Sequence, residues 1–536
     1  MRNGAPRPRL APAVYRVATP PSPSSLSRLA PSNSLPFLKS ASPLPPPPPP
    51  PPPLAHRPAK MEAPLKLKPC AFLLLCACAA ALLRALPASA SFSPVDNYLV
   101  NCGSAADAAV YNRAFLGDSS GSGSPRVLAS SRTISLHDGS PALGTPQIYR
   151  TARAFARPSK YVFEVRERGT HMVRLHFHRF NSSRMEMCDA RFHVLVDGYV
   201  VLSNFSGESE SRPVIKEYLI WVDAEKLVLT FVPAERSKFG FVNAIEVISA
   251  PKDLILETAQ LIDGGKIVNF DGLNRQALEV LYRVTVGGPK VTPFNDSLWR
   301  TWVPDDAFLK STYGSERISF GGRIKYQTGG ASREVGPDNM YNSARVIKST
   351  NATVPNVNMT WVFPVTGDYK YLVRLHFCDI ASISLELLYF NVYVDGFLVF
   401  ENFDLSYVVN EVLAAPFYAD FVVERDDSGI LSVSIGPSNY SMAHAIDGIL
   451  NGVEVMKLNN SMGSLDGEVC GGFILKSWPR GNMGVLVPLV AVICLLLSMS
   501  VVMHRRTTGV SHTVAWTRLP TDMTELSLKQ AKQQFG

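Results

Sequence analysis

Cysteine and net charge are both scarce in the part of the chain that is long enough to form large domains. Residues 91–482 contain only four cysteines, far fewer than a small secreted scaffold held by disulfides would use. The formal net charge of residues 91–503 is −5, and a nucleic-acid-binding protein normally carries a marked basic excess. Four cysteines allow three pairings, and the sequence does not choose among them. The disulfide candidates are Cys102, Cys188, Cys378 and Cys470.

Motifs for catalysis and for metal binding are also missing. The sequence has no recognisable Ser–His–Asp or Cys–His pattern, and none of the glycine-rich loop, Val-Ala-Ile-Lys, His-Arg-Asp or Asp-Phe-Gly motifs of a protein kinase. His176 and His178 lie on one strand face at a spacing that suits metal ligands, but no third ligand accompanies them. We therefore expect a binding protein with no catalytic residue, no metal and no cofactor.

The first 90 residues are unlike a folded domain. Residues 1–60 carry eight basic residues, no acidic residue and a run of nine prolines, which predicts a low-complexity leader. From Met61, two lysines precede an apolar stretch that ends at Ala88-Ser-Ala90, the pattern of a signal peptide over residues 61–90. We expect the mature chain to begin at Ser91. A chloroplast transit peptide is the alternative interpretation of the basic leader.

One long apolar run near the C-terminus predicts a membrane-spanning helix. Residues 483–503 are uncharged, and a helix of that length reaches about 31 Å, enough for the roughly 30 Å hydrocarbon core of a bilayer. His504-Arg505-Arg506 follows directly, so the positive-inside rule places residues 504–536 in the cytosol. We predict a single-pass type I protein of the plasma membrane with an extracellular stalk at residues 461–482.

Sequons for N-glycosylation are confined to the predicted extracellular segment. There are seven Asn-x-Ser/Thr triplets, and all lie between the signal peptide and the apolar run. This confinement predicts glycosylation in the secretory pathway. The candidate acceptors are Asn181, Asn204, Asn295, Asn351, Asn358, Asn439 and Asn459.

The extracellular segment contains the same set of motifs twice, about 200 residues apart. Val173-Arg-Leu-His-Phe177 recurs letter for letter as Val373-Arg-Leu-His-Phe377, and Val196-Asp-Gly198 recurs as Val394-Asp-Gly396. A period of this length corresponds to a whole domain and not to a solenoid unit. We therefore predict two related domains in tandem. The predicted boundaries are residues 91–250 for domain A, 251–276 for a linker and 277–460 for domain B.

Short alternating segments predict an all-β fold for both domains. In Phe192–Gly198 and Phe390–Gly396, bulky residues alternate along the chain and end in Asp-Gly, a strong hairpin signal. Regular short strands separated by Gly, Asn, Asp and Pro turns predict an antiparallel β-sandwich. In the connection between the domains we expect a short helix around residues 276–280.

Five further motifs are specific enough to suggest a family. They are Tyr98-Leu-Val-Asn-Cys-Gly-Ser104, Leu281-Tyr-Arg-Val-Thr-Val-Gly-Gly288, Trp299-Arg-Thr-Trp302, Tyr371-Leu-Val-Arg-Leu-His-Phe-Cys-Asp-Ile380 and Ile449-Leu-Asn-Gly-Val-Glu-Val455. These motifs closely resemble the tandem malectin-like ectodomain of the plant FERONIA/THESEUS-type receptor kinases over residues 93–503. The resemblance implies a jelly-roll-like sandwich for each domain and a cell-surface receptor for a secreted, basic, cysteine-rich peptide. It also implies GPI-anchored co-receptors and related receptor kinases as partners.

Three interpretations of function remain open at this point. The first is a receptor-like protein without a kinase, because the family's kinase would follow the membrane span and only 33 residues follow residue 503. The second is a lectin-like binder of cell-wall polysaccharide, in particular pectin, although the net charge of −5 disfavours an acidic polymer. The third is a truncated gene model of a complete receptor Ser/Thr kinase.

A sugar site is suggested by the further resemblance to malectin, the animal lectin with this fold. One tyrosine of its site lies in a Tyr-x-Thr-x-Arg-like segment, which implies Tyr149 and Tyr341 as ligand-binding residues here. The Tyr-Phe pair of the malectin site corresponds to Asn181-Ser182 in domain A and to Ala381-Ser382 in domain B. The alternative is that both tyrosines are buried with their hydroxyls hydrogen bonded.

Two structural ion pairs are also expected, Arg174 with Asp197 and Arg374 with Asp395.

Overall fold

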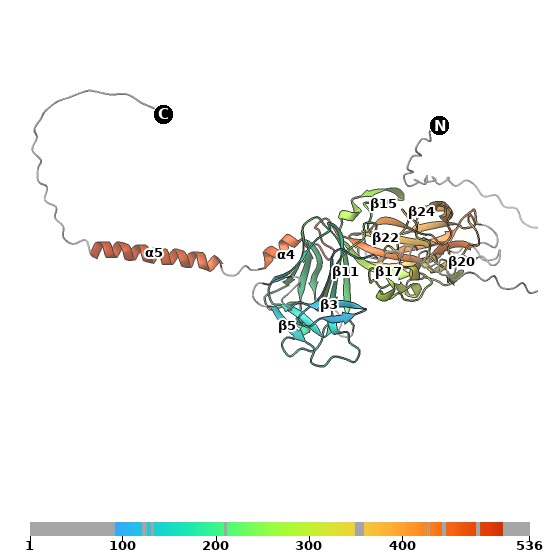
Figure 1. Cartoon of the computed structure of the whole chain (residues 1–536). Coiled ribbons are helices and arrows are strands. Elements are labelled where there is room, and N and C mark those ends of the chain that lie inside the picture. The colour runs from blue at the N-terminus through green and yellow to red at the C-terminus, as the bar shows by residue number, and fades with distance from the viewer. Residues whose placement is uncertain are drawn as a thin grey trace, which may run out of the picture. The chain divides into compact units, whose positions relative to one another are not determined.

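The computed structural model describes two compact units of the chain (Figure 1). The division falls between Leu475 and Lys476. The described residues are 92–119, 126–129, 133–207, 212–348, 358–425, 427, 429–441, 446–478 and 483–507. The predicted leader, signal peptide and most of the cytosolic tail lie outside them, as does Asn351.

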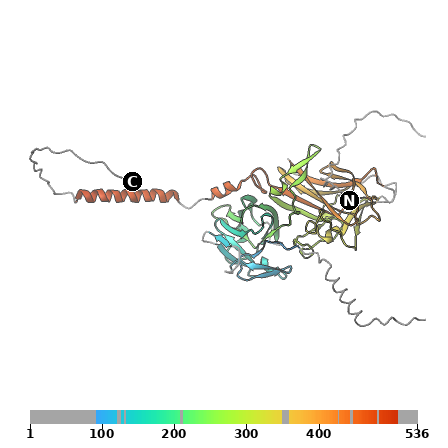
Figure 2. The same ribbon diagram turned by 45° about the horizontal axis from the view of Figure 1, so that its top comes forward.

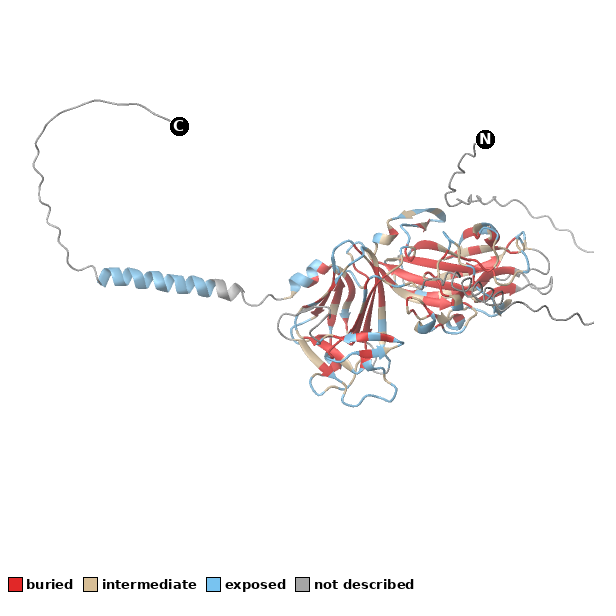
Figure 3. Cartoon of the chain, viewed as in Figure 1, coloured by how far each residue is buried: buried red, intermediate tan, exposed pale blue. Residues whose placement is uncertain are grey.

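Domain A is an all-β sandwich, as predicted. One layer follows the order β11-β8-β14-β1-β3-β2, the other follows β10-β9-β12-β7-β4, and β13-β6-β5 form a third, smaller sheet. Figure 3 shows the buried residues along these strands. The strands are β1 Asn97–Asn101, β2 Ala108–Val110, β3 Arg113–Gly117, β4 Arg126–Ala129, β5 Thr133–His137, β6 Thr151–Phe155, β7 Ser159–Glu164, β8 Gly169–Phe177, β9 Phe192–Val196, β10 Tyr199–Phe205, β11 Val214–Val222, β12 Lys226–Pro233, β13 Gly240–Val242 and β14 Ala244–Ser249.

Domain B repeats this arrangement (Figure 2). Its layers follow β25-β22-β28-β17 and β21-β26-β23-β24, with β19-β20-β27 as the smaller sheet and β18 beside β17. The α-helices among its described residues are the single turns α2 Asp338–Tyr341 and α3 Leu405–Val408. The strands are β17 Leu278–Thr285, β18 Val303–Pro304, β19 Ser315–Ser319, β20 Ser343–Lys348, β21 Met359–Val365, β22 Tyr369–Cys378, β23 Tyr389–Val394, β24 Phe397–Asp404, β25 Pro416–Arg425, β26 Gly429–Pro437, β27 Ile446–Leu450 and β28 Gly452–Leu458.

The Asp-Gly hairpins occur where the sequence predicted them. Asp197 and Gly198 join β9 to β10 with φ of 47° and 92°. Asp395 and Gly396 join β23 to β24 with φ of 51° and 81°. Two positive φ angles in a two-residue loop define the type I′ turn, whose twist matches that of the flanking strands. The turn chemistry therefore fixes the register of both hairpins locally.

The predicted linker is a β-hairpin and not a loose connection. β15 Thr258–Asp263 pairs with β16 Lys266–Asp271, and β15 also lies parallel to β25, which extends the sheet of domain B. The expected helix around residues 276–280 is wrong, because β17 begins at Leu278 and pairs along its length with β28. The pairing with a neighbouring strand decides the conformation of this segment, as tertiary context often does for β-formers.

The two domains share one sheet. β11 of domain A pairs with β17 of domain B through Tyr218 opposite Glu279 and Leu219 opposite Leu278. A single sheet of 13 strands therefore runs through both domains. At the junction the neighbouring residues Tyr218 and Leu219, which point to opposite faces, are both buried, whereas antiparallel sheets commonly keep one face in water.

The segment predicted as a free stalk packs on domain A over its first part. Val200 N–H donates to Gly463 O at 3.0 Å, and Leu465 N–H donates to Val200 O at 2.8 Å. The Leu465 side chain is fully buried in the core of domain A. The chain then forms α4 Gly471–Ser477. Residues 460–466 are therefore packed as part of the folded domains.

The second unit contains α5, Met483–Thr507. Among the described residues it is the one helix that is long and apolar enough to cross a membrane, judged by length and composition. The apolar run at residues 483–503 is therefore helical as predicted, and the helix continues four residues further. Pro488 lies near its start, where a missing N–H disturbs a helix least.

Candidate ligand-binding site

Each domain contains a buried chain of three polar side chains. The histidine in each comes from the repeated Val-Arg-Leu-His-Phe motif, and it joins a tyrosine hydroxyl to a glutamate on the neighbouring strand. The tyrosine-to-Nδ1 distance is 2.9 Å in both domains. The chains are Tyr149–His176–Glu246 in domain A and Tyr341–His376–Glu454 in domain B. The sequence repeat therefore encodes a repeated internal hydrogen-bond network.

The two tyrosines that the sequence predicts to bind a ligand, Tyr149 and Tyr341, belong to these buried chains. Tyr341 is 0% exposed, and burial raises the pKa of its phenol well above the ordinary value. Tyr149 is also largely buried, but it forms part of the wall of a cavity between the domains. A ligand could contact Tyr341 only by displacing the side chains that cover it, whereas Tyr149 lies close to an open space.

The arginine of each repeated motif forms a buried ion pair, but not with the predicted partner. Arg174 Nε donates to Glu217 at 2.6 Å, and Arg374 Nε donates to Asp420 at 2.7 Å. Each acid stands directly opposite its arginine on the adjacent strand. The expected pairs with Asp197 and Asp395 are wrong. These aspartates lie in the hairpin turns, where Asp197 accepts from Val228 N–H and Asp395 pairs with Arg425.

Glu217 links the two domains. Besides Arg174 of domain A, its carboxylate accepts from Arg283 Nη2 of domain B at 2.8 Å. Arg283 in turn pairs with Glu454 at 2.8 Å. Burial alone would raise the pKa of Glu217, but the guanidinium groups of Arg174 and Arg283 outweigh it and hold this pKa at about 2. The junction is therefore an ionised network, with each of these charges satisfied by a partner.

A cavity of about 450 Å³ lies beside this network, between the domains. Its volume is within the range of ordinary ligand pockets, about 300–1,000 Å³. The ion pairs form one wall, and apolar residues, five of them aromatic, form most of the rest. The aromatic lining residues are Tyr111, Phe115, Tyr149, Tyr282 and Trp299.

Two of these aromatic residues have an unusual backbone. Tyr111 has φ of +51° and Trp299 has φ of +54°, and no other aromatic residue in the described part of the chain has a positive φ. Bulky residues rarely adopt this left-handed conformation. For Tyr111 it is part of a two-residue hairpin turn with Asn112, whose φ is +58°, whereas Trp299 lies outside the strands, and strain of this kind is concentrated at ligand sites. Tyr111 is the first residue of the two-residue turn between β2 and β3, and its side chain is 57% exposed. The chain thus presents an exposed aromatic ring to the lining of the cavity.

Arg113 connects Trp299 and the turn that contains Tyr111 to the buried ion-pair network. Its guanidinium carbon lies 4.3 Å from the Trp299 ring centroid, within the range of a cation–π contact. Arg113 Nη1 also donates to Glu246 at 2.7 Å. Because Arg113 directly follows the Tyr111–Asn112 turn, this pairing holds the turn of domain A against Trp299 of domain B. The arrangement suits an apolar or aromatic group inserted between the domains.

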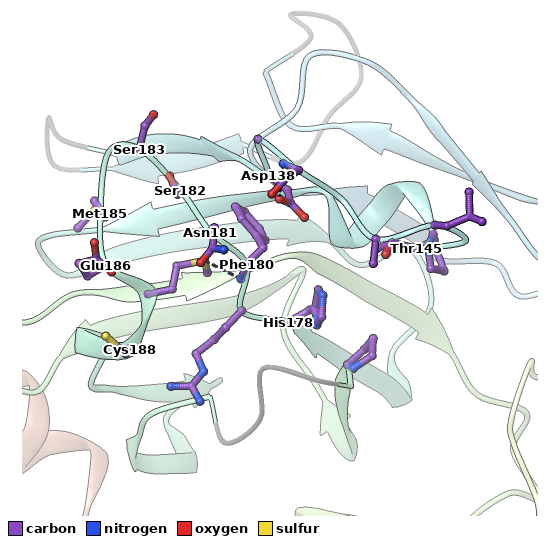
Figure 4. Close-up of a pocket in the computed structure, with 18 of the residues that line it drawn as sticks. Asp138, Thr145, His178, Phe180, Asn181, Ser182, Ser183, Met185, Glu186 and Cys188 are labelled. Atoms are coloured by element: carbon purple, nitrogen blue, oxygen red, sulfur yellow. Dashed lines mark hydrogen bonds between the residues drawn. The ribbon is translucent and has the colours of Figure 1, made fainter.

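A second cavity, of about 960 Å³, lies at the loop end of domain A (Figure 4). The loops that follow β5 and β8 form its walls, and His178 and Asn181 are among the lining residues. His176 and His178, whose spacing alone would suit a metal, have different surroundings, because His176 belongs to the buried chain with Tyr149 and Glu246. Within the described residues, no group of three His, Cys, Asp or Glu side chains could hold a metal ion.

The four cysteines of residues 91–482 are free thiols in the structure. Cys102 and Cys378 are buried in the cores of different domains, and burial raises the pKa of both thiols. Cys188 is exposed, and Cys470 is half-buried. The disulfides allowed by the sequence are therefore not formed in this structure.

The described sequons are accessible. Asn181, Asn204, Asn295, Asn358 and Asn439 are exposed, and Asn459 is half-buried. Surface exposure is what glycosylation requires. The seventh acceptor, Asn351, lies outside the described residues. Glycosylation itself stays a prediction.

Known proteins are similar to this chain over most of its length. A family model described as a malectin-like domain matches residues 100–458. A probable receptor-like protein kinase of Arabidopsis thaliana is 42% identical over 406 residues, which cover 72% of this chain and 48% of that protein. Receptor-like protein kinase THESEUS 1 of Arabidopsis thaliana is 37% identical over 389 residues, covering 71% and 44%. The chain thus aligns with about half the length of these relatives.

Solved structures are similar over the same region. A crystal structure of plant peptide RALF23 in complex with FER and LLG2 matches with 30% identity and a TM-score of 0.60, covering 70% of this chain and 99% of the matched chain. The ANXUR1 extracellular domain from Arabidopsis thaliana matches with 25% identity and a TM-score of 0.62, again covering 70% and 99%. The likeness extends over both domains.

Proposed function

Because this chain belongs to the malectin-like domain family and is similar to the ectodomain region of receptor-like protein kinases, we propose that it is the ligand-binding part of a cell-surface receptor. Its ligand is a secreted, basic, cysteine-rich peptide, which inserts an apolar or aromatic side chain between the two domains. The observation that carries this proposal is the cavity lined by the strained Tyr111 and Trp299.

The chemistry of the ectodomain supports a basic ligand. The net charge of residues 91–503 is −5, which attracts a cationic peptide and makes its binding sensitive to salt. A similar structure contains a peptide and a co-receptor, RALF23 and LLG2, bound to FER. By analogy, a GPI-anchored co-receptor and related receptor kinases are the proposed partners, and the plasma membrane is the proposed location, with α5 as the single span.

The lectin alternative finds less support. It depended on Tyr149 and Tyr341, whose hydroxyls are bonded to histidines, with Tyr341 fully buried. The relatives are kinases, but the matched region of this chain is the ectodomain, so phosphoryl transfer is not assigned to it.

The proposal is tested with Tyr111→Asn in a secreted fragment of residues 91–482. Asparagine tolerates the left-handed turn, so this change removes the ring and keeps the backbone. If the ring contacts the ligand, affinity for the basic peptide should fall about 10- to 30-fold, the loss expected at an aromatic hot spot of about 2 kcal/mol. Isothermal titration calorimetry at low and high salt measures it.

The matched control is Tyr313→Asn. Tyr313 is also an exposed tyrosine, at 63%, but it lies in domain B away from the cavity lining. We expect the Tyr313→Asn variant to bind the basic peptide with the same affinity as the unchanged protein. Equal affinities for both variants would reject the cavity as the peptide site, and binding of oligogalacturonide in place of the peptide would favour the lectin.

A further inference from the structure

The loop-end cavity of domain A differs from the inter-domain cavity in its chemistry. Its volume of about 960 Å³ is near the upper limit of ligand pockets. Polar side chains form much of its wall, with a few apolar surfaces between them (Figure 4). The polar lining residues include Asp138, Ser140, Thr145, His178, Ser182 and Glu186. Hydroxyl, carboxylate and imidazole groups around apolar surfaces suit a carbohydrate, which presents both hydroxyls and C–H faces.

A glycosylation sequon forms part of this wall. Asn181, Ser182 and Ser183 all line the cavity, and together they are the Asn-x-Ser triplet. Asn181 is exposed, so its amide is accessible for modification. Its backbone carbonyl accepts a hydrogen bond from Gly139 N–H, at 3.5 Å, which holds the sequon loop against the opposite loop. A sugar attached to Asn181 would therefore start at the wall of this cavity.

Tethering makes occupancy of the cavity by this sugar favourable. A group held by a short flexible linker has an effective concentration in the millimolar range. Contacts between the cavity and a sugar can then be weak and still keep the attached glycan in place. A free wall saccharide would have to exceed that effective concentration in order to displace it.

We propose that the N-glycan on Asn181 folds into the loop-end cavity of domain A and fills it. The cavity is thereby an internal glycan site that pins the loops after β5 and β8 and is closed to external saccharides. The inference is independent of peptide binding between the domains, because the two cavities have different linings apart from Pro146.

The first test compares two glycans on the full-length glycoprotein purified from plant cells. Asn204 is the control, because it is an exposed acceptor of domain A that does not line this cavity. Under native conditions, an endoglycosidase should release the Asn181 glycan about tenfold more slowly than the Asn204 glycan, and the two rates should become equal after denaturation. Glycopeptide mass spectrometry measures both. Equal native rates, or an unmodified Asn181, would overturn the proposal.

The second test removes the glycan by two independent substitutions. Ser183→Ala destroys the sequon, and Asn181→Gln is a second route to the same state. In either variant, the emptied cavity should bind a free oligomannose probe saturably, whereas the glycosylated protein should not. Failure of both folded variants to bind the probe would contradict the proposal. Peptide affinity should be unchanged in Ser183→Ala, so a loss of peptide binding in Tyr111→Asn reports separately on the proposed function.

Discussion

Glu217 offers the sharpest test of how the two domains are held together. It is buried and accepts hydrogen bonds from Arg174 Nε at 2.6 Å and from Arg283 Nη2 at 2.8 Å. Glu217→Gln keeps the size of the side chain but removes its charge, which leaves two buried guanidinium groups short of a partner. Removing one partner of a buried ion pair costs about 3–5 kcal/mol.

The pKa of Glu217 gives a second measure of how much free energy its charge contributes to folding. Its value of about 2, against an ordinary 4.5, corresponds to about 3 kcal/mol of folding free energy above pH 5. A carboxyl whose pKa is lowered by folding stabilises the folded state above its unfolded pKa, and this contribution is lost as pH falls through the folded pKa. The stability difference between the unchanged protein and Glu217→Gln should therefore be constant from pH 7 to pH 5 and shrink between about pH 4.5 and pH 2.

Urea unfolding of the fragment 91–482, followed by tryptophan fluorescence at several pH values, measures this difference. Glu424→Gln is the matched control, because Glu424 pairs with Lys370 at 3.4 Å on the surface, with its side chain 57% exposed. An exposed pair contributes about 0–1 kcal/mol. A Glu217→Gln variant no less stable than the control, or a difference that persists unchanged at pH 2, would refute the argument that the junction depends on this buried charge.

Two further predictions concern the thiols and the segment after domain B. In the native fragment, Cys188 should react with a maleimide within minutes because it is exposed, while the buried Cys102 and Cys378 stay unlabelled until urea unfolds the protein; a disulfide at Cys188 in the mass spectrum would contradict this. Leu465→Ala should lower the free energy of unfolding by about 2–5 kcal/mol and expose residues 460–475 to limited proteolysis, because Leu465 is fully buried. The control Leu475→Ala, at a partly exposed position, should change the stability by about 0.5 kcal/mol at most, and equal proteolysis of both variants would reject a packed segment.

If the Asn181 glycan and the inter-domain cavity have the proposed roles, the duplicated domains serve different purposes. Both domains keep the same internal Tyr–His–Glu chain, but Tyr149 lines the cavity between the domains, whereas Tyr341 is fully buried. The asymmetry arises where the domains meet, because β11 pairs with β17 and brings Trp299 next to Arg113. Duplication thus supplied a junction that neither domain contains alone.

The amino-acid sequence by itself determined the local features of this protein. Period-two alternation predicted the strands, two Asp-Gly pairs predicted the type I′ hairpins, and residues 483–503 predicted the apolar helix, because each depends on residues that are close in the chain. The letter-for-letter repeat of Val173–Phe177 predicted two related domains. These inferences needed no knowledge of which strands are neighbours.

Only the tertiary structure decided which distant residues meet. Arg174 was expected to pair with Asp197, but the strand order β11-β8-β14 places Glu217 and Glu246 opposite it instead. Tyr111 and Trp299 are far apart in the sequence, and their shared cavity follows from the pairing of β11 with β17. Sheet order and domain packing are set by the summed burial of many side chains, which no local pattern encodes, and for that physical reason the site between the domains could not be found from the sequence.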